Sequence, residues 1–222
     1  LLGSTVGLLA RKGIPEKVSG AIMTAISLCT LYAGVSGMLK GENTLVLIVS
    51  MVLGTAAGTL LDLDGALARL GKAIESRFRR TDGKTSVAEG FVTASLLFCI
   101  GAMAIIGSFD EGLRGDRAVV LSKTIIDSFA ALAMASAYGL GVLFSAIPVL
   151  IYQGALTLLA GSLQSWLDPA TMTELTAVGG TLIIGIGLNM LEITRISLSN
   201  MLPALLAVVG LCALTASFAG TI

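Results

Sequence analysis

The stretch LSKTIIDSFAALAMAS, residues 121–136, places a lysine and an aspartate four residues apart inside a long apolar run. On a helix, Lys123 and Asp127 share one face, where they can form an ion pair. An ionised carboxylate deep in hydrocarbon is costly unless it is paired, hydrated or protonated. Two interpretations stay open: a structural ion pair, or a carboxylate that takes up a proton, a sodium ion or a cationic group. We favour the second, because intramembrane carboxylates tend to mark solute and proton pathways.

The next apolar run, residues 141–166, supplies polar neighbours for Asp127. Pro148 lies in this run between Ser145 and Gln153 and removes a backbone hydrogen bond, which predicts a helix break. The connection YGLG is so short that this run and the preceding one must be adjacent and antiparallel. The alternative is that Gln153 only ties helices together. The sequence therefore predicts a midplane substrate or ion site formed by Lys123, Asp127, Ser128, Ser145 and Gln153.

Two further features lie near the C-terminal end of the chain. The run GGTLIIGIG, residues 179–187, is rich in glycine, so we expect it to unwind at Gly185 and Gly187 and to offer carbonyl groups to a solute. Asn189, Asn200 and Pro203 flank the turn between the last two apolar runs. They are candidates for a gate, although capping and stopping of helices explains the same residue types more simply.

Composition defines the class of protein that must position these residues. The 222 residues are 55% hydrophobic and only 13% charged, whereas a soluble domain is normally about 25% charged. The net charge of zero gives no basic face for nucleic acid, and the chain has no histidine. Because the usual nucleophile–base and metal-ligand constellations are missing, we expect no enzyme, no metal and no cofactor. The composition indicates an integral membrane protein.

The apolar segments predict an all-α, polytopic bundle of about eight transmembrane spans in one domain covering residues 1–222. Lysine and arginine gather in alternate connections, which places those connections in the cytoplasm. A seven-span arrangement stays open. The predicted spans are 1–10 (truncated), 19–39, 43–61, 87–108, 117–138, 141–166, 172–191 and 198–220.

Residues 62–80 form the one extended amphipathic element, with apolar residues at three- and four-residue spacing and several basic residues elsewhere. Asp62 and Asp64 lie at its start, where the helix dipole favours acidic groups. We interpret it as a helix on the cytoplasmic membrane surface, followed by a loop to residue 86. A partner-binding or gating helix is the alternative.

The two ends of the chain resemble one another. LGS (2–4) matches AGS (160–162), and AGVSGML (33–39) echoes GIGLNML (185–191). Residues 1–61 and 141–222 are therefore candidate repeats around the central spans at 87–138. Spans 1–3 and 6–8 would be inverted copies, a plan that recurs in secondary transporters. Chance similarity between sequences rich in small residues is the competing explanation.

Longer stretches resemble a known family. AEGFVTASLLFCIGAMAIIGS, GLRGDRAVVLSKTIIDSFAALAMAS and GLGVLFSAIPVLIYQGALTLLAG are similar to the YqgA-like bacterial inner-membrane proteins, a domain of unknown function. GGTLIIGIGLNML and NMLPALL fit the C-terminal part of that family. Ala102 and Ser128 depart from it, where proline and glycine are more usual. The resemblance implies a multi-pass protein of the bacterial inner membrane with a transport role.

Transport of a small solute or ion, with proton or sodium coupling through Asp127, is the function that these features favour. The alternative is a non-transporting membrane scaffold or regulator that uses residues 62–80 as its partner surface. The expected partners are the lipid bilayer and an unidentified solute or ion, not nucleic acid. The glycine-rich faces are also compatible with a homodimer.

Overall fold

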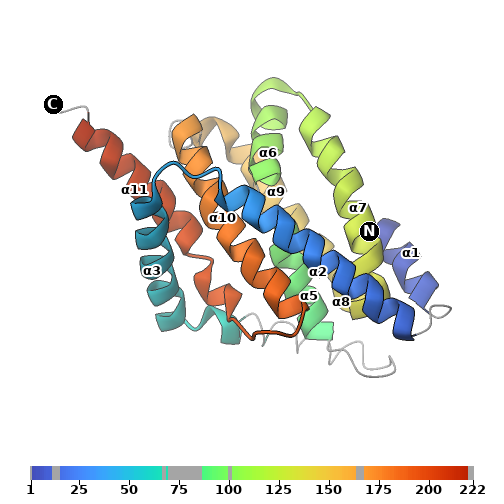
Figure 1. The fold of residues 1–222 in the computed structure, drawn as a ribbon. Coiled ribbons are helices and arrows are strands. Elements are labelled where there is room, and N and C mark those ends of the chain that lie inside the picture. Colours follow the sequence, from blue (N-terminus) through green and yellow to red (C-terminus); the bar gives the residue numbers. More distant parts are fainter. Residues whose placement is uncertain are drawn as a thin grey trace.

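The computed structural model describes residues 2–11, 16–66, 69, 87–99, 102–163 and 168–219. Within these ranges the chain is helical and contains no strand (Figure 1). The elements are α1 (Leu2–Arg11), α2 (Glu16–Met38), α3 (Thr44–Leu60), α5 (Val87–Cys99), α6 (Ala102–Arg114), α7 (Ala118–Tyr138), α8 (Leu140–Phe144), α9 (Ala146–Leu163), α10 (Pro169–Met190), the 3-10 helix η1 (Leu198–Met201) and α11 (Ala204–Ala219).

The helices α2 and α10 form the most extensive contact of the bundle and run side by side through its centre (Figure 1). Their backbones come close because glycine lies at the crossing. A Cβ atom on Gly34 would lie 2.7 Å from the backbone nitrogen of Ile184, and one on Gly187 would lie 2.8 Å from the Leu31 side chain. The residue numbers rise on α2 as they fall on α10, so the two helices are antiparallel. Small residues thus allow the close packing on which membrane helices depend.

Two other helix pairs flank this centre on opposite sides (Figure 1). On one side α3 packs against α11 and η1, where a Cβ atom on Gly54 would overlap Ala204 and one on Gly58 would overlap the backbone of Asn200. On the other side α1 packs against α7, with Gly3 against the carbonyl group of Ser128. The pair α3–α11 is antiparallel by the same numbering argument.

Large apolar side chains cover much of the outer surface of the helices. On α7, the exposed set is Leu121, Ile125, Ile126 and Phe129, and α9 carries a similar set at Ile147, Leu150, Ile151, Leu158 and Leu159. Contiguous apolar surface of this extent is unusual on a soluble monomer. Four segments in the described part of the chain are long and apolar enough to cross a membrane, with mean hydropathy between 1.4 and 1.9: Ala118–Tyr138, Leu140–Ser162, Pro169–Met190 and Leu198–Thr215.

The structure corrects two details of the predicted spans. The span expected over 87–108 extends further, because α6 continues to Arg114; residues 100 and 101, between α5 and α6, lie outside the described residues. In the run 141–166 the helix is interrupted at Ser145, between α8 and α9, one turn before Pro148. Proline has no N–H group to donate to the preceding turn, so the interruption lies where Pro148 is expected to disturb the helix.

The second correction concerns the glycine-rich run. The helix α10 is continuous through Gly185 and Gly187, so the expected unwinding is wrong. Both glycines are buried, Gly185 against Leu198 and Gly187 against Leu31, and packing explains them. Of the amphipathic helix expected over 62–80, the structure describes 62–66 and Arg69; residues 63–66 are helical, and the rest lies outside the described residues.

Candidate functional site

The helix α7 carries the two charged residues with which the sequence analysis began. Its 21 residues extend about 30 Å at 1.5 Å per residue, and Asp127 lies near the midpoint. Lys123 Nζ donates a hydrogen bond to Asp127 Oδ2, so the two side chains form an ion pair within one helix. The lysine side chain is 9% exposed and the aspartate side chain 30% exposed. The ammonium group is therefore enclosed by protein, whereas the carboxylate is open on one side.

Other polar groups approach this pair from neighbouring helices. Cys99, at the end of α5, lies within electrostatic range of both Lys123 and Asp127. Tyr152 of α9 lies within electrostatic range of Cys99. Ser128 uses its hydroxyl group locally, donating to the carbonyl oxygen of Thr124 at 2.7 Å. Cys99 comes near the pair through tertiary packing, because α5 and α7 are in contact.

The remaining residues of the predicted midplane site make no hydrogen bond to the pair among the described residues. Ser145 is buried at the α8–α9 junction and donates to the carbonyl oxygen of Val142 at 2.7 Å. Gln153 is half-buried on α9, and its side chain makes no hydrogen bond to the residues that the structure describes. Within that part of the chain, hydrogen bonding joins Lys123 to Asp127 and leaves the other three predicted residues outside the pair.

The proposed gate residues cap and fasten chain ends. The Asn189 amide donates from Nδ2 to the Ile196 carbonyl oxygen at 2.8 Å, and its Oδ1 accepts from the Thr194 hydroxyl and the Ile196 N–H. This side chain therefore closes the loop after α10. Pro203 precedes α11, and its carbonyl oxygen accepts the N–H groups of residues 206 and 207. Both contacts agree with the capping interpretation.

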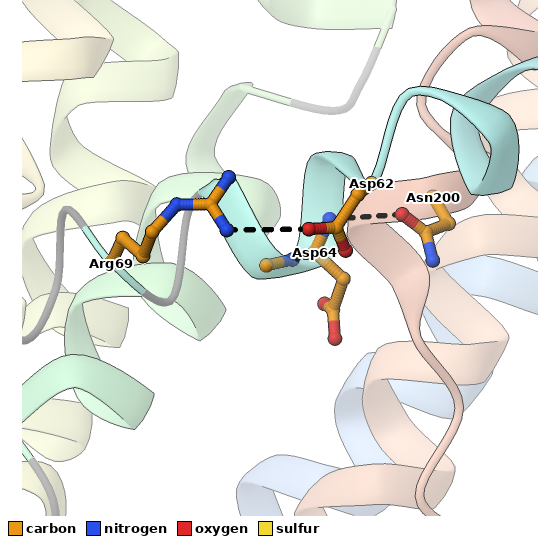
Figure 2. Close-up of polar contacts among 5 residues, drawn as sticks. Asp62, Asp64, Arg69 and Asn200 are labelled. Carbon is orange, nitrogen blue, oxygen red and sulfur yellow. Dashed lines mark hydrogen bonds and ion pairs between the residues drawn. The ribbon is translucent and has the colours of Figure 1, made fainter.

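Asn200 makes a longer-range contact, which Figure 2 shows. Its Oδ1 accepts the backbone N–H of Asp64 at 2.8 Å, so η1 fixes the chain that follows α3. Asp62 has a positive φ of 49° and turns the chain out of α3. The carboxylate of Asp62 accepts the N–H of Gly65 at 3.2 Å and pairs with Arg69 at 3.3 Å.

A small pocket lies beside this contact. Its volume is about 70 Å³, and it opens between the end of α3, the helices α5 and α10, and η1. The polar lining residues are Asp64, Thr93, Asn189 and Ser199, and the apolar ones are Val92, Leu96, Ile186, Ile196 and Leu198. No local pattern in the sequence marks this pocket, because its walls come from four separate segments.

A buried carboxylate at the opposite end of α10 was also missed. Glu174 is 6% exposed, and its Oε1 accepts the backbone N–H groups of Glu42 and Asn43 at 2.9 and 2.8 Å. Its Oε2 is buried without a hydrogen-bond partner in the described part of the protein. The contact ties the α2–α3 corner to α10. Its only sequence signal is a single acidic residue within an apolar run.

The N-terminus of α10 is capped outside the apolar span. The Asp168 Oδ1 accepts the backbone N–H of Thr171 at 2.7 Å. Hydrogen bonds from the side chain and the backbone of Thr171 lower the pKa of Asp168 below its usual value. This arrangement is that of an N-cap residue, which stabilises the first turn of a helix.

These features define a helical membrane protein with a charged pair inside one spanning helix. Its sequence matches over residues 1–213 the family described as "Protein of unknown function (DUF554)", and the chain belongs to that family. It is 30% identical over 210 residues to the "Uncharacterized membrane protein YdfK" of Bacillus subtilis, an alignment that covers 93% of this chain and 88% of the relative.

A second relative gives the same picture. The chain is 30% identical over 216 residues to the "Uncharacterized protein YqgA" of Escherichia coli, covering 96% of this chain and 92% of the relative. The resemblance to YqgA-like proteins is thus confirmed, and with it the membrane assignment. No solved structure gives a significant match.

Proposed function

We propose that the protein is a multi-pass transporter of the bacterial inner membrane that moves a small solute or ion by way of Asp127. The observation that carries this proposal is the ion pair on α7, because Lys123 is enclosed while the Asp127 carboxylate is partly open. A surface pair of this spacing adds little stability, and a buried pair is often no better than two apolar residues. Function is then the stronger reason to keep two charges in this helix.

The geometry suggests how the pair takes part in transport. In the resting pair, Lys123 neutralises Asp127 from one side. A proton or a cation that reaches the open side of the carboxylate competes with the ammonium group for the same oxygen atoms. Occupancy would weaken the pair and change how α7 packs against its neighbours. This exchange is the coupling step that we assign to Asp127.

The arrangement of the helices supports an inverted repeat. The helices α2 and α10 are antiparallel, as are α3 and α11, as expected for pairs exchanged by a two-fold axis in the membrane plane. The helices α1 and α9 pack against α7 and α6 respectively, and α6 and α7 contact each other. A two-fold axis through the centre would exchange these contacts as well.

The second candidate function is a non-transporting scaffold or regulator, a monomer or a homodimer. One observation favours it: the pair is complete within α7 and needs no other helix to satisfy the charges. A scaffold uses the pair only for packing, so apolar residues of similar volume should replace it without loss of function. A transporter needs the carboxylate itself. The two functions therefore differ in what they predict for an apolar replacement.

The test is ion flux in proteoliposomes that enclose a pH-sensitive dye. An imposed sodium or proton gradient should produce flux in the wild type and none in Asp127→Asn. The matched control is Asp116→Asn, which removes the same charge from the exposed turn before α7, where an Asn side chain still caps Ala118. Equal flux in Asp127→Asn and wild type, or no flux under any gradient, would refute the assignment.

A further inference from the structure

We propose that the pocket beside η1 binds a small monovalent cation through the carboxylate of Asp64. The pocket has a volume of about 70 Å³, which is ample for a small ion together with some of its water molecules. Its size leaves room for other small solutes, so the chemistry of its lining decides the ligand.

Asp64 is held in place through its backbone and leaves its carboxylate free for a ligand. Its N–H donates to Asn200, and the backbone of Asn200 packs directly against Gly58 of α3. In Figure 2 the Asp64 carboxylate points away from both Asn200 and the Asp62–Arg69 pair. Among the residues that the structure describes, this carboxylate has neither an ion pair nor a hydrogen bond, although it lines the pocket.

The other polar groups around the pocket decide the charge of the ligand. The Asn189 amide already makes hydrogen bonds to the backbone of Ile196 in the loop after α10, so it fixes this side of the pocket and adds no charge. The hydroxyl groups of Thr93 and Ser199 belong to the lining and are neutral oxygen ligands. One carboxylate with neutral oxygens suits a single positive charge, because divalent ions recruit several carboxylates or keep much of their water.

Two neighbouring features agree with this choice. No group of three or more histidine, cysteine, aspartate or glutamate residues that could hold a metal occurs in the described part of the chain. Arg69, the basic residue described in the segment after α3, is engaged by Asp62 rather than by Asp64. The negative charge of Asp64 is therefore left for an external cation. An anion would be repelled by the same carboxylate.

The experiment measures thermal unfolding of the purified protein in detergent. Choline chloride is replaced stepwise by NaCl, KCl or NH4Cl at constant ionic strength, because the methyl groups around the choline nitrogen prevent direct coordination by oxygen atoms. We expect a saturable rise in Tm with at least one of the three ions. In Asp64→Asn the half-saturating concentration should rise at least about tenfold, which corresponds to 1.4 kcal/mol.

The matched control is Asp62→Asn, which removes the same charge two residues away at an exposed position and keeps an oxygen that can cap Gly65. This variant should keep the rise in Tm. Thr93→Val provides a second test if Asp64→Asn does not fold, because it removes one neutral oxygen with little change in volume and should weaken the rise. No saturable rise in the wild type, or equal rises in wild type and Asp64→Asn, overturns the site.

The place of this pocket on a transport route rests on the proposed function, but ion binding does not. Binding is measured in detergent, where no flux is needed. A wild type that shows the rise in Tm but no flux in proteoliposomes keeps the Asp64 site and removes the transport proposal. Flux that depends on Asp127, without any rise in Tm, keeps transport and removes this site.

Discussion

Replacement of the α7 pair by apolar residues should have unequal costs at its two positions. Asp127→Leu leaves the ammonium group of Lys123 without a partner, and that side chain is only 9% exposed. Lys123→Met leaves the carboxyl group of Asp127, which is 30% exposed and can become neutral by taking up a proton. The loss of the aspartate should therefore destabilise the protein more than the loss of the lysine.

The magnitudes follow from this burial. An uncompensated buried charge costs about 3–5 kcal/mol, the range that we assign to Asp127→Leu. For Lys123→Met we expect about 1–2 kcal/mol, because the less enclosed carboxyl group can take up a proton, which reduces the penalty. In the double variant both charges are absent, so its stability should lie within about 1 kcal/mol of the wild type. The summed cost of the two single substitutions should then exceed the cost of the double substitution by at least about 3 kcal/mol.

The stability assay is reversible unfolding in mixed detergent micelles with increasing SDS, followed by circular dichroism. If the costs of the two single substitutions sum to the cost of the double substitution within about 0.5 kcal/mol, the two side chains are uncoupled and the pair is refuted. A larger cost for Lys123→Met would refute the burial argument. Flux is the second readout: a stable double variant without flux supports the transport role, and one with normal flux supports the scaffold.

Other contacts give predictions of the same kind. Glu174→Leu removes the acceptor of two backbone N–H groups and should lower the free energy of unfolding by about 2–4 kcal/mol, whereas Glu174→Gln retains an acceptor and should cost less than half of that in the same SDS titration. Gly58→Ala should lower Tm, because its Cβ would overlap the backbone of Asn200, while Gly154→Ala on α9 meets open space and should leave Tm unchanged or raise it. Asp168→Ala should cost about 1 kcal/mol by removing the N-cap of α10. Since the folded-state pKa of Asp168 is lowered from 3.8, its contribution is present above that value and should be lost as the pH falls through the lower, folded-state pKa in an acid titration.

Local patterns in the sequence were sufficient for the membrane class and for the contact on α7. Apolar runs mark helices by length alone, and two charges four residues apart meet on any helix, so the Lys123–Asp127 pair follows from spacing. The capping interpretation of Asn189 also depends on nearby residues, since its partners lie within seven positions. Such contacts join residues that are close in the sequence, so local spacing is enough to predict them.

The errors arose where tertiary packing decides the outcome. Gly185 could have marked an unwound segment, and only its contact with η1 shows that it serves packing. Glu174 and Asn200 bind backbone groups more than 130 residues away, at Glu42 or Asn43 and at Asp64 respectively. No spacing rule connects positions so far apart.

The polar residues of the bundle fall into two groups with different explanations. Asn189, Asn200 and Glu174 lie near chain reversals and bind backbone groups that lack a partner within a helix, so helix ends account for a polar residue at each place. Lys123 and Asp127 lie in the middle of a continuous helix whose backbone groups are already paired. Within the described part of the chain they hydrogen-bond only to each other, so removal of both would leave no unpaired group there. Because architecture requires neither charge, the transport proposal rests on this pair rather than on the polar ends of the helices.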